Sequence, residues 1–273
     1  ASDKDTDNFG TLKRDISTKY QTVESVAFLP GCNTDSADGC LLAAGSGFDS
    51  IELFEVVDGS LQYTLRGLSQ TIAFSPDGHF LAAGTEEKAI NLWEFSDGGI
   101  VGNGSPKYSL SGSSHLLKDL AFSPDCAGDQ TPLSQCLLAA ASGNGDVQLW
   151  SVSENASEAL GGLSQMFSGH TEPVVEIAFS RDGKHLLSGS WDQTLRRWNV
   201  ASSQVLLTLD DFLFWDGSYD ISPDSEQLAA VISDGSVWLV HKNGRLLHIL
   251  GGHRVQLTEL VYLPGYETNG MFG

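Results

Sequence analysis

A short phrase, written AFSPDG at residues 73–78, occurs six times with small variations in this 273-residue chain. The copies begin at residues 27, 73, 121, 178, 220 and 261, so the mean spacing is about 47 residues. Self-similarity at such a period is typical of architectures in which each repeat forms one supersecondary unit. The repeat therefore restricts the fold to a solenoid, a propeller or a similar array of units.

Each of the first five copies is followed by three short apolar or alternating stretches. In the second unit these stretches cover residues 80–84, 90–93 and 107–110. Gly, Pro, Asp and Ser bound the stretches, and none keeps a helical period for the length of a helix, so the pattern predicts strands. The phrase itself predicts a strand followed by a hairpin turn, because Pro fixes φ and Gly accepts a positive φ. Four strands per unit, repeated radially, describe the blades of a propeller.

The fourth unit carries the fullest motif, SGHTEPVVEIAFSRDGKHLLSGSWDQTLRRWN at residues 168–199. It resembles the WD-repeat pattern of Gly-His, a Ser-Pro-Asp-Gly turn, Ser-Gly-Ser, a turn Asp and a closing Trp-Asp. Arg181 replaces the Pro of that pattern and Asn199 replaces the final Asp. The other units fit more loosely, and the resemblance covers roughly residues 9–265. It implies an all-β propeller of four-stranded WD-type blades.

The units start near residues 21, 69, 114, 171, 215 and 256, after a polar tail at residues 1–8. Residues 9–18 are expected to form one outer strand, and residues 256–263 to begin a sixth unit. Five complete units and a partial sixth give about 22 strands, fewer than the roughly 24 or 28 of six or seven closed blades. We therefore expect part of a six- or seven-bladed ring, with a second chain supplying the missing strands. A six-bladed ring with one thin blade is the alternative.

The resemblance implies a structural role for four polar or aromatic side chains in the fourth unit. His170, Ser190, Asp192 and Trp198 are expected to form a buried chain of hydrogen bonds that ties the outer strands to the inner ones. Ser188 is the alternative to Ser190. A Ser-His-Asp hydrolase site is the competing interpretation, but the chain lacks a nucleophile motif such as Gly-x-Ser-x-Gly. We therefore expect no catalytic residue.

The four cysteines form two pairs that are close in sequence, Cys32 with Cys40 and Cys126 with Cys136. Each pair brackets an insertion between the first and second strands of a unit, and two antiparallel strands would bring its ends to disulfide distance. Free buried thiols are one alternative, and a zinc site is another, although the spacings are not those of zinc fingers. Two disulfides would indicate an oxidising compartment, so the expectation is a secreted, extracellular or periplasmic protein.

The charge balance excludes several partners. Fifteen Lys and Arg against 35 Asp and Glu give a net charge of −20. Nucleic acid and anionic membrane surfaces both require basic faces, and no apolar run approaches the roughly 20 residues that would cross a bilayer. The same acidity favours a basic protein or peptide as partner. Asp-rich turns suggest calcium, but the EF-hand spacing is absent, so neither a metal nor another cofactor is expected.

In WD-repeat propellers, two sets of loops share one face around the central channel. Aromatic side chains with a polar rim are typical of contact surfaces. We expect this face to bind the partner through Phe48, Asp49, Glu87, His115, Trp191, Trp215, Asp216 and Arg254.

These patterns favour a non-catalytic secreted scaffold that binds a protein or peptide through its loop face. One alternative is a propeller hydrolase or lyase with calcium or carboxylates at the channel. Another is a sensor or scaffold part of a larger polypeptide. The two enzyme classes would require carboxylates or histidines that converge at the inner ends of several blades.

Overall fold

The computed structural model describes residues 18, 22–31, 40–46, 50–66, 71–96, 99–113, 115–126, 136–152, 163–210, 219–222, 224–231 and 236–251. This part of the chain contains 21 β-strands, one short 3-10 turn, η1 (Pro124–Cys126), and no α-helix. All strand pairs are antiparallel. The expected all-β fold of WD-type sheets is confirmed.

The strands form five sheets, named here blades 1 to 5 in chain order. Blade 1 contains β1 (Ser25–Phe28), β2 (Leu41–Gly45), β3 (Ser50–Glu55) and β4 (Leu61–Arg66). Blade 2 contains β5 (Ile72–Phe74), β6 (Phe80–Gly84) and β7 (Ile90–Ser96), and both β8 (Gly99–Ile100) and β9 (Tyr108–Leu110) pair with β7.

The other three blades have four strands each in simple chain order. Blade 3 contains β10 (Leu117–Phe122), β11 (Leu137–Ser142), β12 (Val147–Ser151) and β13 (Leu163–Phe167). Blade 4 contains β14 (Val174–Phe179), β15 (His185–Ser190), β16 (Leu195–Asn199) and β17 (Val205–Leu209). Blade 5 contains β18 (Tyr219–Ile221), β19 (Gln227–Val231), β20 (Val237–His241) and β21 (Leu246–Leu250).

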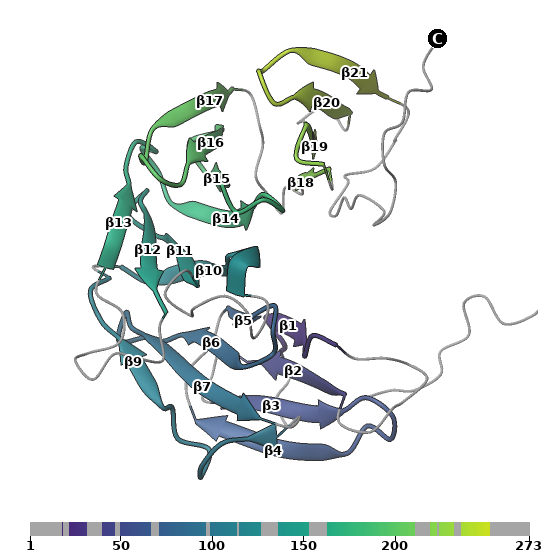
Figure 1. Ribbon diagram of the computed structural model, residues 1–273, viewed down its shortest axis with the longest axis vertical. Helices are drawn as coiled ribbons and strands as arrows, with labels where there is room; N and C mark the ends of the chain where they lie inside the picture. Colours follow the sequence, from purple (N-terminus) through teal and green to yellow (C-terminus); the bar gives the residue numbers. More distant parts are fainter. Residues whose placement is uncertain are drawn as a thin grey trace, which may run out of the picture.

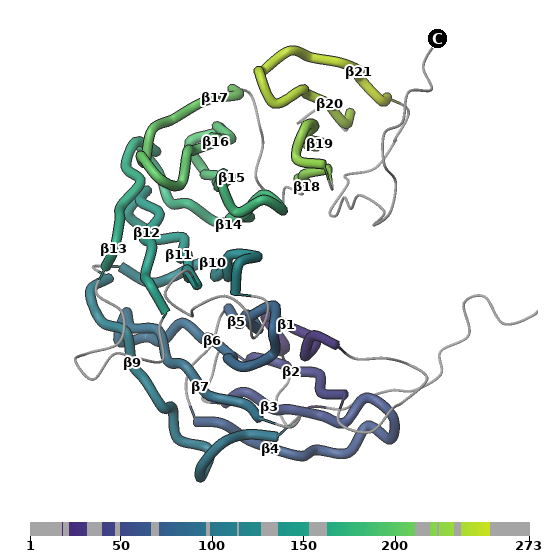
Figure 2. The backbone as a smooth tube through the Cα atoms, viewed as in Figure 1, coloured from purple at the N-terminus to yellow at the C-terminus, as the bar shows by residue number. Residues whose placement is uncertain are grey.

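The five blades follow one another around an arc (Figure 1). The first strand of each blade lies toward the centre of the arc and the last strand lies at the outside, as the backbone tube also shows (Figure 2). Residues 9–17 and 256–263, the expected outer strand and the expected start of a sixth unit, lie outside the described residues. The expected strand total therefore stays a prediction.

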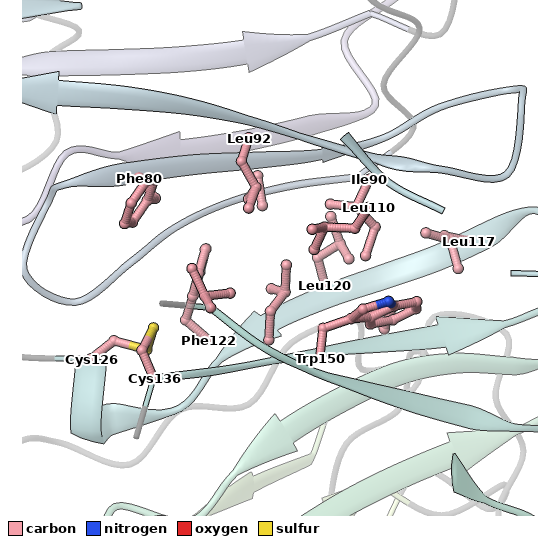
Figure 3. Close-up of a cluster of buried hydrophobic side chains, with 14 residues drawn as sticks. Phe80, Ile90, Leu92, Leu110, Leu117, Leu120, Phe122, Cys126, Cys136 and Trp150 are labelled. Carbon is pink, nitrogen blue, oxygen red and sulfur yellow. A yellow bond between two sulfur atoms is a disulfide. The ribbon is translucent and has the colours of Figure 1, made fainter. Parts of the chain in front are cut away.

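The core lies between blades rather than within one sheet. We call the side of a blade that faces the preceding blade its near face, and the opposite side its far face. Figure 3 shows one such junction, where Phe80 and Leu92 from the far face of blade 2 meet Leu120 and Phe122 from the near face of blade 3. Burying one large apolar side chain contributes roughly 1.5–3 kcal/mol, so each junction holds its two sheets together.

The recurrent phrase forms the turn after the first strand. In blade 2, Ser75 Oγ donates to Asp77 Oδ1 at 2.5 Å and accepts a hydrogen bond from the backbone N–H of Phe80 at 2.9 Å. Gly78 has a φ of 73°, a conformation that suits glycine. Blades 4 and 5 repeat the Ser–Asp bond. The Ser and the Asp therefore fix the turn together with the Pro and Gly that the sequence analysis emphasised.

Candidate functional site

A chain of hydrogen bonds crosses blade 4 from its loop end to its third strand. His170 Nδ1 lies 2.9 Å from Asp192 Oδ2, and His170 Nε2 lies 2.7 Å from Ser188 Oγ. Trp198 Nε1 donates to the same Ser188 oxygen at 2.7 Å. Thr194 Oγ1 also donates to Asp192 Oδ1 at 2.7 Å. The network thereby joins the segment before β14, strand β15, the β15–β16 turn and strand β16.

Ser188, not Ser190, occupies the serine position of this network. Ser190 Oγ instead donates to the backbone carbonyl of Glu172 at 2.9 Å and accepts from the backbone N–H of Asp192 at 3.1 Å. Side chains two residues apart on a strand point to the same face, so the alternation could not choose between the two serines. Ser190 therefore fixes the turn, while Ser188 links the imidazole to the indole.

The electrostatics of the network favour a neutral histidine beside an ionised aspartate. Burial lowers the pKa of His170, against the opposing effect of Asp192. Burial acts to raise the pKa of Asp192, but hydrogen bonds from Thr194, Thr171 and His170 lower it on balance. The order Asp–His–Ser matches that of a hydrolase triad. The Ser188 side chain, however, has no solvent exposure, and the Trp198 N–H holds its oxygen, so a substrate cannot reach it in this conformation.

Sequence reasoning missed a pair of carboxyl groups on the inner strands of blades 3 and 4. Asp119 Oδ2 accepts a hydrogen bond from the backbone N–H of Ile177 at 2.9 Å, so it joins blade 3 to blade 4. Burial raises the pKa of Asp119 to about 6, although hydrogen bonds from Ile177, Leu120 and Thr71 oppose the rise. Burial also raises the pKa of Glu176 to about 8, and the charges of Asp119 and Asp220 add to the effect.

Blade 1 holds blade 2 in a similar way, but with a neutral group. Ser25 Oγ accepts a hydrogen bond from the backbone N–H of Ile72 at 3.2 Å. Ser25, Asp119 and Glu176 all stand two residues before the Ala of the repeated phrase. That shared position was the available signal. Within the described residues, no three His, Cys, Asp or Glu side chains gather as metal ligands would.

Three of the residues expected on the partner-binding face are described. Glu87 in the β6–β7 turn, His115 before β10 and Trp191 in the β15–β16 turn are all exposed. Trp191 is 55% exposed, and its backbone N–H donates to the carbonyl of Pro173 at 3.0 Å. Phe48, Asp49, Trp215, Asp216 and Arg254 lie outside the described residues.

Cys126 and Cys136 lie together at the connection between β10 and β11. Their Cα atoms are 4.5 Å apart and their sulfur atoms are 2.14 Å apart. Cys32 lies outside the described residues, so the geometry of the first pair is not available for comparison with Cys40. That both pairs are oxidised in the cell stays a prediction.

Several curated proteins resemble parts of this chain. A periodic tryptophan protein 2 homolog of Neurospora crassa is 35% identical over 117 residues, which are 40% of this chain and 12% of that protein. Small ribosomal subunit protein RACK1 of Dictyostelium discoideum is 29% identical over 92 residues, 34% of this chain and 26% of that protein. Human coronin-7 is 32% identical over 123 residues, 44% of this chain and 13% of that protein. The chain thus spans 12% to 26% of these relatives.

The expected secretion and extracellular or periplasmic location are wrong. Relatives from three organisms are small ribosomal subunit proteins, and ribosomal subunits are intracellular. The expectation rested on cysteine spacing alone. Antiparallel strands that leave one turn bring two cysteines together by geometry, so their closeness does not identify an oxidising compartment.

No helix in the described part of the chain has the length and apolar character needed to cross a membrane. The sequence pattern of the WD40 family, described as "WD domain, G-beta repeat", matches residues 59–94 and 161–199. The second match contains the buried network of blade 4, and both fall within antiparallel sheets of the expected type. The chain is therefore a WD-repeat β-propeller protein.

Proposed function

We propose that this chain is a non-catalytic scaffold that binds a basic peptide segment of another protein through the loop face around Trp191. The observation that carries the proposal is the 55% exposure of an indole whose backbone is fixed. An exposed tryptophan on a rigid turn can bury a large apolar area on binding with little loss of conformational entropy.

The charges near this indole favour a cationic partner. Glu172 precedes Pro173, the residue that anchors Trp191, and Glu86 and Glu87 lie in the corresponding turn of blade 2. All three glutamates lie in a chain whose net charge is −20. Opposite charges steer encounter and reject acidic competitors, whereas the aromatic anchor supplies affinity.

The enzyme alternative has one supporting observation, the raised pKa values of Asp119 and Glu176. A general acid or base must also reach its substrate. Asp119 already accepts backbone hydrogen bonds from Leu120 and Ile177. These bonds support a role in joining blades, and the scaffold remains the better proposal.

A peptide library displayed on phage tests the proposal. We expect the purified chain to select sequences rich in Lys and Arg, with binding that weakens as salt rises. Trp191→Ala should reduce the affinity of the selected peptides by about tenfold or more, as loss of a hot-spot residue does. Leu206→Ala is the matched control, since Leu206 is 51% exposed on the outer strand β17. Equal binding by wild type and the Trp191 variant would refute the loop face as the binding site.

A further inference from the structure

The inner strand of every blade presents two apolar side chains on its near face. These pairs are Val26 and Phe28, Ile72 and Phe74, Leu120 and Phe122, Ile177 and Phe179, and Tyr219 and Ile221. In blades 2 to 5 the first member of the pair is only 5–6% exposed. In blade 1, by contrast, Val26 is 61% exposed and Phe28 is 60% exposed.

The difference follows from what covers each pair. In blades 2 to 5, the pair packs in the same cluster as an alanine at the centre of the preceding inner strand. These alanines are Ala27, Ala73, Ala121 and Ala178. Figure 3 shows the arrangement for Leu120 and Phe122, which point toward the side chains of blade 2. A small residue on one sheet thus makes room for two large residues on the next.

Val26 and Phe28 therefore form a junction face whose partner is missing. Two adjacent apolar side chains this exposed at the centre of a strand are unusual for an isolated surface. Their positions in the repeat state what complements them, because four internal junctions have the same design. The complement is the far face of a WD-type blade with a small residue at the centre of its inner strand.

We propose that the near face of blade 1 binds a WD-type blade that belongs to a separate polypeptide. Val26 and Phe28 keep their exposure in the fold of this chain, which argues for a partner from outside it. A second copy of the chain is a poor partner. At the end of its arc, blade 5 carries Asp220 at the position of the alanines, paired with Ala229 on its far face. That carboxylate would face Phe28 without a cationic partner, which is costly in an apolar junction.

A photo-crosslinker at position 28 identifies the occupant. The chain with Phe28→p-benzoylphenylalanine is added to an extract of the source cells, irradiated, and its adducts are mapped by mass spectrometry. We expect adducts on the inner strand of a WD-type blade in another polypeptide. The control carries the same crosslinker in place of Leu206 on β17, and it should not produce this adduct. Adducts to a second copy, to this chain itself or to proteins without WD repeats would overturn the proposal, as would the absence of adducts.

A charge substitution then tests the face without the crosslinker. Phe28→Asp should leave the unfolding midpoint of the isolated chain unchanged, because the side chain is already exposed. It should lower recovery of the identified partner in co-purification by about tenfold or more, because the new charge would be buried in the junction. Val26→Ser provides a milder second variant with a smaller loss. Wild-type recovery with both variants would overturn the proposal, and so would unfolding of both variants.

Discussion

Blades 3 and 4 place the same tryptophan in the same register but stabilise it differently. Trp150 pairs with Leu138, and Trp198 pairs with Leu186. The N–H of Trp198 reaches Ser188, whereas Ala140 stands two residues beyond Leu138, where blade 4 has that serine. The Trp150 N–H has no hydrogen-bond partner in the described residues. Blade 4 is therefore held by a polar network, and blade 3 by apolar packing.

The rest of the network is also missing from blade 3. Asn144 stands six residues before Trp150, as Asp192 stands six residues before Trp198. Asn144 bonds only to Asp146, within its own turn. Blade 2 uses a third solution, in which Trp93 Nε1 donates to the carbonyl of Gly104 at 3.1 Å. The fold requires the buried indole but accepts different hydrogen-bond partners, so the full motif is not needed in each blade.

The largest expected effect is on the aspartate that organises blade 4. Asp192→Ala should lower the free energy of unfolding by about 3 kcal/mol, because it strands the ring N–H of His170, the Thr194 hydroxyl and two backbone N–H groups. Asn144→Ala at the equivalent exposed turn of blade 3 should cost less than about 0.5 kcal/mol. Urea unfolding measures both. Equal losses would mean that the two blades do not differ as described.

The two serines of β15 should separate in the same assay. Ser188→Ala should cost about 2 kcal/mol, since it leaves the imidazole and the indole N–H without their shared oxygen. Ser190→Ala should cost about 1 kcal/mol, because it removes bonds only within the turn. A larger loss for Ser190→Ala would show that the turn, and not the network, holds the blade.

The carboxyl groups at the blade 3–4 junction should make stability depend on pH, unlike the serine at the blade 1–2 junction. Their pKa values are raised in the folded state to about 6 for Asp119 and about 8 for Glu176. The folded state therefore binds protons more tightly, so stability falls as pH rises from about 4.5 through 8. We expect Glu176→Gln to remove on the order of 1–2 kcal/mol of the loss between pH 5 and 8.

The measurement for this prediction is the unfolding free energy of both proteins at several pH values. The difference between wild type and variant isolates Glu176 from the other titrating groups. Ser25→Ala serves as a control that should leave the pH dependence unaltered. Parallel curves for wild type and Glu176→Gln would contradict the assignment.

The smallest effect should come from giving blade 3 the serine of blade 4. Ala140→Ser places a hydroxyl where the buried Trp150 N–H can donate to it, and should add about 0.5–1 kcal/mol of stability. Differential scanning calorimetry should record the gain as a small rise in Tm. A fall in Tm would mean that the packed site has no room for the added oxygen.

Sequence reasoning identified what depends on local pattern and missed what depends on neighbouring blades. The strands of Leu137–Ser142 and Val147–Ser151 follow from turn residues and alternation. The alternation could not select Ser188 over Ser190. The bond from Ile177 to Asp119 joins residues 58 positions apart, and only the packing of two blades brings them together. Exposure of Val26 likewise depends on what lies beside blade 1.

The backbone bonds at Ser25 and Asp119 bear on how such a protein can change over evolution. They connect the innermost strands, where the distance from one blade to the next is set by a single side chain. Inserted residues there would separate donor from acceptor, whereas added residues in the outer connections leave these bonds intact. Variation in repeat length is therefore tolerated at the rim, and the hub acts as the fixed ruler of the ring.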